Sequence, residues 1–126
     1  NSTMVAFNKN TGKTIWESVG QKTWEGVSAI GWPGEPLVRW NGFEKLASYS
    51  TPKLATVHGK RLLFSLTRQG LVALNPKDGS IKFSRWFRSR VNESVNAANP
   101  VVSGSQVFCS SAYYGAGSFL LDVGIA

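Results

Sequence analysis

The sequence predicts an all-β fold on the basis of a repeated phrase and of the residue pattern inside it. Residues 5–16 recur as residues 72–83, and each position is offset by 67 residues (79 minus 12, and 73 minus 6). Both copies begin with a short apolar run, pass through a turn that contains Asn and Gly, and end in an alternating run. Gly permits positive φ, Asn and Asp favour tight reversals, and alternation with period two is typical of a strand. Each copy is therefore predicted to form a strand, a turn and a strand.

A partial third copy sets the length of the repeat. Gly70 recurs as Gly117 and Asn75 as Asp122, both at an offset of 47 residues (117 minus 70, and 122 minus 75). A unit of this length with about four strands is the sequence signature of a β-propeller blade. The longer first interval indicates an insertion between two blades.

The chain is expected to hold parts of three four-stranded antiparallel blades. Strands are predicted, in order, over 3–8 and 13–19, over 53–57, 61–67, 70–75 and 80–87, and over 99–103, 106–111 and 117–123. The chain then divides into the last two strands of one blade (1–19), a Trp- and Gly-rich insertion between blades (20–50), a complete blade (51–88), and a loop with the first three strands of the next blade (89–126). Because a propeller closes with about four to eight blades, we interpret the chain as a fragment of a larger propeller.

The first copy of the phrase resembles the tryptophan-docking motif of PQQ-type, or quinoprotein-like, β-propeller repeats. The matching residues are Ala6, Asn8, Thr11, Gly12, Lys13 and Trp16. The second copy has Asp78, Ser80 and Phe83 where the motif has Thr, Lys and Trp, which implies a weaker docking contact there. The resemblance implies a structural docking role for Ala6, Thr11, Gly12, Trp16, Ala73, Asp78, Gly79 and Phe83.

The chain is basic, with a formal charge of +7 from 14 Lys and Arg against 7 Asp and Glu. Such a charge is compatible with an anionic polymer as partner. The basic residues are dispersed, however, and are dense only over 82–90, where they alternate with aromatic residues. This pattern favours the outer strand of a blade with a solvated charged face, and no nucleic-acid partner is expected. No apolar run approaches the length of a membrane helix, so no membrane span is predicted in this segment.

Two single residues have structural interpretations. Cys109 sits in a strand-like run, which predicts a buried structural thiol. His58 stands beside Gly59 in a predicted hairpin turn, and there is no second His with which it could form a metal site. We therefore expect His58 to be a surface turn residue.

The predicted strand order sends the loops to two faces of the propeller. Both repeated turns lie on one face, whereas the insertion and the loop over 88–98 lie on the other, where any ligand is expected. The candidate ligand residues are Trp24, Trp32 and Trp40 in the insertion, and Arg88, Arg90, Asn92, Glu93 and Asn96 in the loop.

Each of these two groups has two interpretations. The Trp side chains could form a stacking platform for sugars, bases or a quinone ring, or they could anchor the insertion onto the propeller rim, which we favour. The guanidinium and amide groups could hold an anionic or sugar-like ligand, or the amides could bridge backbone groups between blades. The sequence does not decide between these last two.

The resemblance, together with the lack of a recognisable catalytic constellation, favours a non-catalytic scaffold or binding module with no cofactor. It implies protein partners that bind a propeller face, as in outer-membrane assembly lipoproteins, and a periplasmic or exported location, although this segment carries no signal peptide. One alternative is part of a quinoprotein alcohol dehydrogenase that uses PQQ and Ca²⁺, for which Glu93 and Glu25 are the acidic residues on the expected face. The other is a carbohydrate- or polyanion-binding propeller.

Overall fold

The chain forms antiparallel sheets throughout the part that the structure, a computed structural model, describes: residues 4–18, 49–88, 95–111 and 115–124. The first sheet is a hairpin of β1 (Met4–Phe7) and β2 (Thr14–Ser18). The second has the order β3 (Lys53–Val57), β4 (Lys60–Leu66), β5 (Gly70–Leu74) and β6 (Ile81–Trp86). The third has the order β7 (Val101–Ser103), β8 (Gln106–Ser111) and β9 (Gly117–Asp122).

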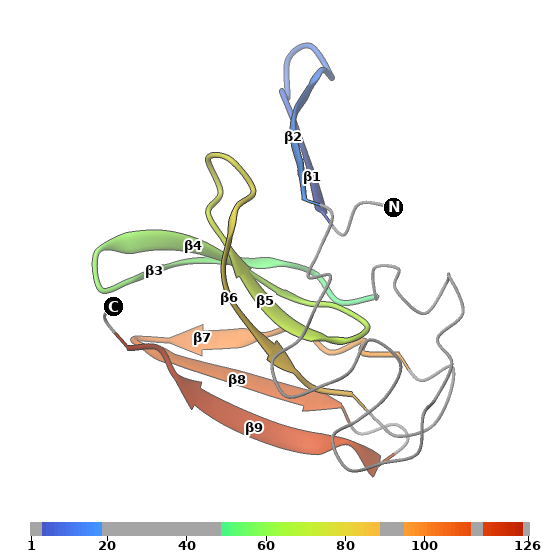
Figure 1. Cartoon of the computed structure of the whole chain (residues 1–126), viewed down its shortest axis with the longest axis vertical. Helices are drawn as coiled ribbons and strands as arrows, with labels where there is room; N and C mark the ends of the chain where they lie inside the picture. The colour runs from blue at the N-terminus through green and yellow to red at the C-terminus, as the bar shows by residue number, and fades with distance from the viewer. Residues whose placement is uncertain (1–3, 19–48, 89–94, 112–114, 125–126) are drawn as a thin grey trace.

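The three sheets follow one another in space as they do in sequence. Figure 1 shows the β1–β2 hairpin standing apart from the two larger sheets, next to the turn that joins β5 to β6. Within each sheet, strands that follow one another in the chain are paired, so each sheet is a simple meander. In the described ranges no helix is long and apolar enough to cross a membrane.

The predicted strands are confirmed to within two residues at each end. The all-β fold with antiparallel sheets is also confirmed. The predicted insertion lies outside the described residues, apart from its last two positions.

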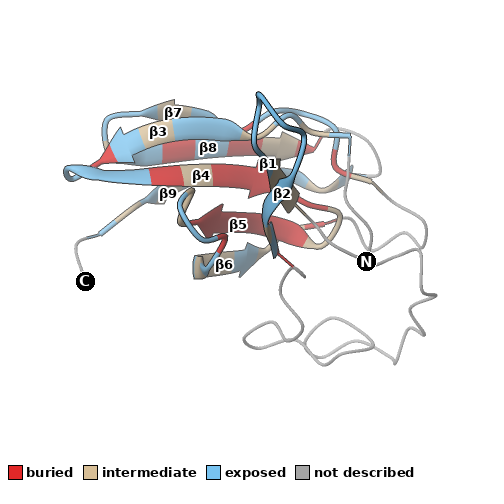
Figure 2. Ribbon diagram, turned by 90° about the horizontal axis from the view of Figure 1, so that it is seen from above, coloured by how far each residue is buried: buried red, intermediate tan, exposed pale blue. Residues whose placement is uncertain are grey.

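The core lies between the second and third sheets and is centred on β4 and β5, as the red segments of Figure 2 show. Phe64 and Leu66 of β4 and Leu71 of β5 are completely buried. Val107 and Cys109 of β8 pack against them from the third sheet. Burial raises the pKa of the Cys109 thiol to about 11, which fits the predicted structural thiol.

The third sheet has one buried and one exposed face. Along β8, Val107 and Cys109 point inward, whereas Phe108 between them is exposed. Val101 of β7 and Leu120 of β9 are exposed as well. This alternation with period two is what a sheet packed on one side requires.

We expect Phe64→Ala to lower the free energy of unfolding by about 3–5 kcal/mol, because it opens a cavity in the core. Phe7→Ala is the matched control, since the Phe7 side chain is 59% exposed. Its effect should stay within about 0.5 kcal/mol. Chemical denaturation of the two variants measures both values, and equal losses would contradict the position of the core.

Candidate functional site

The two copies of the repeated phrase form turns of the same construction. The N–H of Gly12 donates to the carbonyl of Asn8, and the N–H of Gly79 donates to the carbonyl of Asn75, both at 2.8 Å. The side-chain Oδ1 of Asn8 accepts from the N–H of Asn10 at 2.9 Å, and the Oδ1 of Asn75 accepts from the N–H of Lys77 at 3.1 Å. Each Asn thus closes its turn with its own side chain.

The second turn differs from the first at Asp78. Its Oδ1 accepts the N–H of Ser80 at 2.9 Å, and its Oδ2 accepts from Nδ2 of Asn75 at 3.1 Å. The hydrogen bonds from Ser80, with smaller contributions from the charge of Lys82 and from Asn75, hold the pKa of Asp78 below its ordinary value. An ionised carboxylate therefore supplies the acceptor that the hydroxyl of Thr11 supplies in the first turn.

Trp16 joins the β1–β2 hairpin to the second sheet. Its indole Nε1–H donates to the carbonyl oxygen of Pro76 at 3.0 Å. A Cβ atom on Gly79 would overlap the indole ring, and Gly79 has a φ of +72°. The bare backbone at Gly79 therefore lets the ring lie directly against the turn.

Phe83 takes the position of Trp16 in the second copy of the phrase. It pairs with Ala73 across its sheet, as Trp16 pairs with Ala6 across the hairpin. The Phe83 ring lies 6.2 Å, between centroids, from the ring of Phe64 in the same sheet. A phenyl ring has no N–H, so it cannot donate the hydrogen bond that the indole donates.

A register shift beside each of these rings sets one residue out of the ladder. In the hairpin the unpaired residue is Ile15, and in the second sheet it is Lys82. Such a bulge re-aims the extra side chain. The two copies therefore share a bulge, but its extra side chain is apolar in the first copy (Ile15) and basic in the second (Lys82).

His58 makes a second contact between a ring nitrogen and a carbonyl, and the sequence did not predict it. Its Nε2 lies 2.7 Å from the carbonyl oxygen of Val123, which joins the second sheet to the third. The carbonyl can only accept, so the ring presents Nε2–H there. His58 is an exposed turn residue, as expected, but it also bridges two sheets.

Val123 corresponds to Pro76 in the repeat, at an offset of 47 residues (123 minus 76). The same offset relates Gly70 to Gly117, at the start of β5 and β9. Consecutive turns therefore present equivalent carbonyls to the sheet before them.

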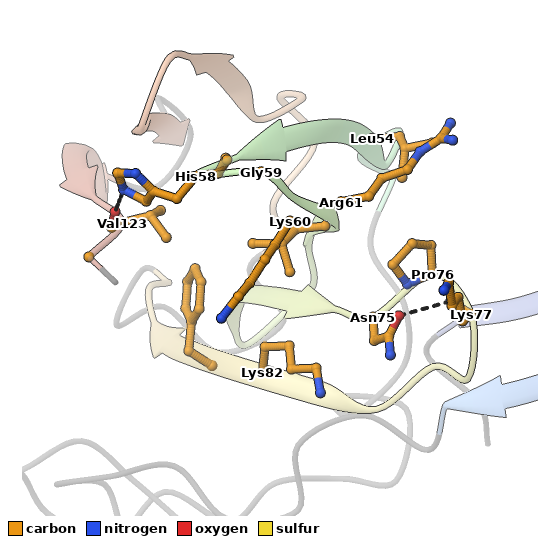
Figure 3. A pocket seen from close by; sticks show the side chains of 14 residues that line it. Leu54, His58, Gly59, Lys60, Arg61, Asn75, Pro76, Lys77, Lys82 and Val123 are labelled. Carbon is orange, nitrogen blue, oxygen red and sulfur yellow. Dashed lines mark hydrogen bonds between the residues drawn. The ribbon is translucent and has the colours of Figure 1, made fainter. Parts of the chain in front are cut away.

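A groove with a volume of about 980 Å³ opens beside the His58 contact (Figure 3). Part of its lining is apolar: Leu54, Val57, Leu62, Phe83 and Val123. Among the described residues, every ionisable side chain that lines it is basic: His58, Lys60, Arg61, Lys77 and Lys82. We call it the basic groove. It lies on the side of the repeated turn Asn75–Gly79, opposite the face on which the sequence predicted ligand residues.

Asn96 lies at the other ends of the strands, away from the repeated turn, and holds the ends of β4 and β6 together. Its Nδ2 donates to the carbonyl of Thr67, after β4, at 2.9 Å, and to the carbonyl of Phe87, after β6, at 2.8 Å. The Asn96 side chain is 1% exposed. In addition, the carbonyl of Asn96 accepts from the N–H of Tyr49 at 3.3 Å. Of the two interpretations of this loop, the geometry of Asn96 favours the backbone bridge.

The basic run over 82–90 lies on the outer strand β6, where Lys82 and Arg85 are exposed as expected, but Arg88 after the strand departs from this pattern. Arg88 is 5% exposed, so this candidate ligand residue is buried. The guanidinium carbon of Arg85 lies 5.1 Å from the centroid of the Phe119 ring, and that ring packs edge-on against Phe87 at 4.7 Å. Arg85 therefore contacts the third sheet with its guanidinium group while remaining exposed, as Lys82 does, and only Arg88 is buried.

Comparison with known proteins assigns the chain to a family. The family model for the outer membrane protein assembly factor BamB, a PQQ-type repeat, matches residues 1–119. The chain belongs to this family. No curated protein and no solved structure matches it. The BamB match supports the PQQ-like propeller fold that the repeated phrase predicted.

The BamB-family match leaves the remaining candidate residues untested. The Trp residues of the insertion and the loop residues Arg90, Asn92 and Glu93 lie outside the described residues. A Ca²⁺ ion takes about 6–8 oxygen ligands. Over 4–18, 49–88, 95–111 and 115–124, no group of three or more His, Cys, Asp or Glu could hold a metal ion. Glu25 and Glu93, the acidic residues of the quinoprotein alternative, lie outside these ranges.

Gly79→Ala should destabilise the protein more than Gly12→Ala, although both glycines have nearly the same φ, +72° and +71°. At Gly12 nothing lies within 4 Å of the added methyl group, so only the backbone cost of about 1 kcal/mol remains. At Gly79 the methyl group also displaces the Trp16 ring, which should add about 1–3 kcal/mol. Chemical denaturation of both variants measures the difference. Equal losses would show that the Trp16 contact contributes little.

Asn96→Asp should lower the free energy of unfolding by about 1–3 kcal/mol, because a carboxylate cannot donate to the two carbonyls that Nδ2 now bonds. Asn10→Asp is the control, since it introduces the same charge at an exposed turn position. We expect the control to change stability by no more than about 0.5 kcal/mol. A loss of the same size in the control would assign the effect to charge alone.

Proposed function

We propose that this chain is a non-catalytic propeller module that holds its blades in register and binds a protein partner on a propeller face. The observation that carries the proposal is that Trp16 and Asn96 both donate their hydrogen bonds to backbone carbonyls of the second sheet. Trp16 bonds the neighbouring turn, and Asn96 bonds the ends of two strands. These side chains, which could otherwise face a ligand, stabilise contacts between sheets.

Membership of the BamB family supports a protein partner, since the family's name is that of an assembly factor. It also supports a location at the outer membrane, on its periplasmic side. The basic groove is a recess to which a partner has access, because the turn and strand residues His58, Lys60, Lys77 and Lys82 that line it are exposed, while Val57 and Leu62 of the core form part of its floor.

The test of the non-catalytic role uses the full-length protein with added PQQ and Ca²⁺. We expect no dye-linked oxidation of alcohols above the rate of the protein alone, and no rise in the thermal unfolding midpoint. A known PQQ-dependent dehydrogenase, reconstituted with the same reagents, is the positive control. Alcohol oxidation by the full-length protein would overturn the proposal in favour of the quinoprotein alternative.

A further inference from the structure

The two junctions between sheets use one kind of contact, made by different residues. At the first junction, the ring nitrogen of Trp16 lies 3.0 Å from the carbonyl oxygen of Pro76. At the second, the ring nitrogen of His58 lies 2.7 Å from the carbonyl oxygen of Val123, the repeat equivalent of Pro76. The side chain at the position of Trp16 in the second sheet is Phe83, which has no donor. A ring-to-carbonyl hydrogen bond is present at both junctions, but at the second it comes from the turn between β3 and β4 and not from β6, the strand equivalent to β2.

The backbone of His58 supports a specific role for its ring. Its φ is +48°, and it is the one residue other than glycine with positive φ in the described ranges. The matching turn of the third sheet begins with Gly104, at a φ of +57°. Glycine adopts this conformation freely and other residues adopt it rarely. The hydrogen bond from the ring to Val123 explains why His and not Gly stands at position 58.

The acceptor is held in place from its own sheet. The N–H of Val123 donates to the carbonyl of Ser105 at 2.8 Å, and the hydroxyl of Ser105 donates to Asp122 at 2.7 Å. The carbonyl of Val123 is therefore fixed toward the second sheet, where His58 reaches it. This bond ties the two walls of the basic groove together at one end (Figure 3).

The change of donor also leaves space. At the first junction the indole lies directly over Gly79. At the second, Phe83 rests near Phe64 of its own sheet and lines the basic groove together with Val123. Phe83 is therefore part of the groove wall, and its phenyl ring is smaller than the indole at the equivalent position of the first copy.

The charges in the groove indicate its occupant. Lys60 begins β4, and the bulge in β6 presents Lys82 at the position that Ile15 has in the hairpin. Figure 3 shows both lysine side chains extending into the hollow. Asp78, close enough to Lys82 to interact electrostatically, is already bonded to Ser80 and Asn75 and is not part of the lining. Basic side chains over an apolar floor suit a segment that alternates acidic and apolar residues.

We propose that the basic groove binds an acidic segment of the partner protein, and that it is open because His58 has replaced residue 83 as the donor across this junction. The proposal rests on the proposed function, since it names the surface and the chemistry of the partner. Its readout is peptide binding, which is separate from the PQQ assay, so each proposal can fail without the other.

The binding test uses the full-length protein and a fluorescein-labelled peptide of alternating Glu and Leu, with fluorescence anisotropy as the readout. Lys60→Glu combined with Lys82→Glu should weaken binding by about tenfold or more at low salt. Lys9→Glu combined with Lys13→Glu is the control, because it makes the same change of net charge at exposed positions of the first turn. A peptide with Gln in place of Glu should bind neither the natural protein nor the Lys60→Glu, Lys82→Glu variant. Equal weakening by both double variants would overturn the proposal, as would tight binding of the Gln peptide.

The change of donor is tested with Phe83→Trp and His58→Gly. Phe83→Trp should fill the groove and weaken binding of the Glu-Leu peptide by about tenfold, while the thermal unfolding midpoint stays the same or rises. His58→Gly should lower that midpoint in the natural sequence, although glycine relieves the positive φ, and should lower it less in the Phe83→Trp background. Unchanged peptide binding by Phe83→Trp would show that the groove is not the site. An equal loss of stability in both backgrounds would show that the two rings do not substitute for each other.

Discussion

The rest of the structure depends on the bond between a ring N–H of one sheet and a turn carbonyl of the next. A small antiparallel sheet has two faces and cannot bury both by itself, so it has to be held against its neighbours. The turn that receives Trp16 is shaped for this purpose. Asn75 closes it with its own side chain, Pro76 presents the carbonyl, and Gly79 leaves room for the ring. The first copy of the repeated phrase supplies the indole of this junction, and the second copy supplies the turn that receives it.

The second junction shows how such a design tolerates change. The carbonyl of Val123 is in the same place in the repeat as that of Pro76, and it too receives a ring nitrogen. What the fold requires is therefore a donor within reach of the carbonyl, and either a strand or a hairpin turn can carry it. A donor in the turn contacts the carbonyl from the edge of the junction and leaves its centre open.

Much of the fold could be predicted because its signals are local. Alternation and turn residues located the strands, and the apolar run around Cys109 predicted its burial. Contacts between sheets were harder to predict, because they join residues that are far apart in the sequence and share no local pattern. His58 looked like an ordinary turn residue, and only the alignment of Val123 with Pro76 could have suggested its acceptor. Asn96 was recognised as a candidate, but its two roles differ in whether its Nδ2 reaches a ligand or backbone carbonyls, which only the folded chain shows.

Charge density along the sequence was a poor guide to charge in space. The dense run over 82–90 drew attention, yet Arg85 lies against the Phe119 ring and Arg88 is buried. Lys60 and Lys82, by contrast, are 22 residues apart (82 minus 60) and are brought to one groove by strand pairing and by a bulge. An arginine can stack on an aromatic ring and remain in a packed region, whereas a lysine keeps its ammonium in water. Arg85 consequently contacts the third sheet through the Phe119 ring, whereas Lys60 and Lys82 line the basic groove on the turn side.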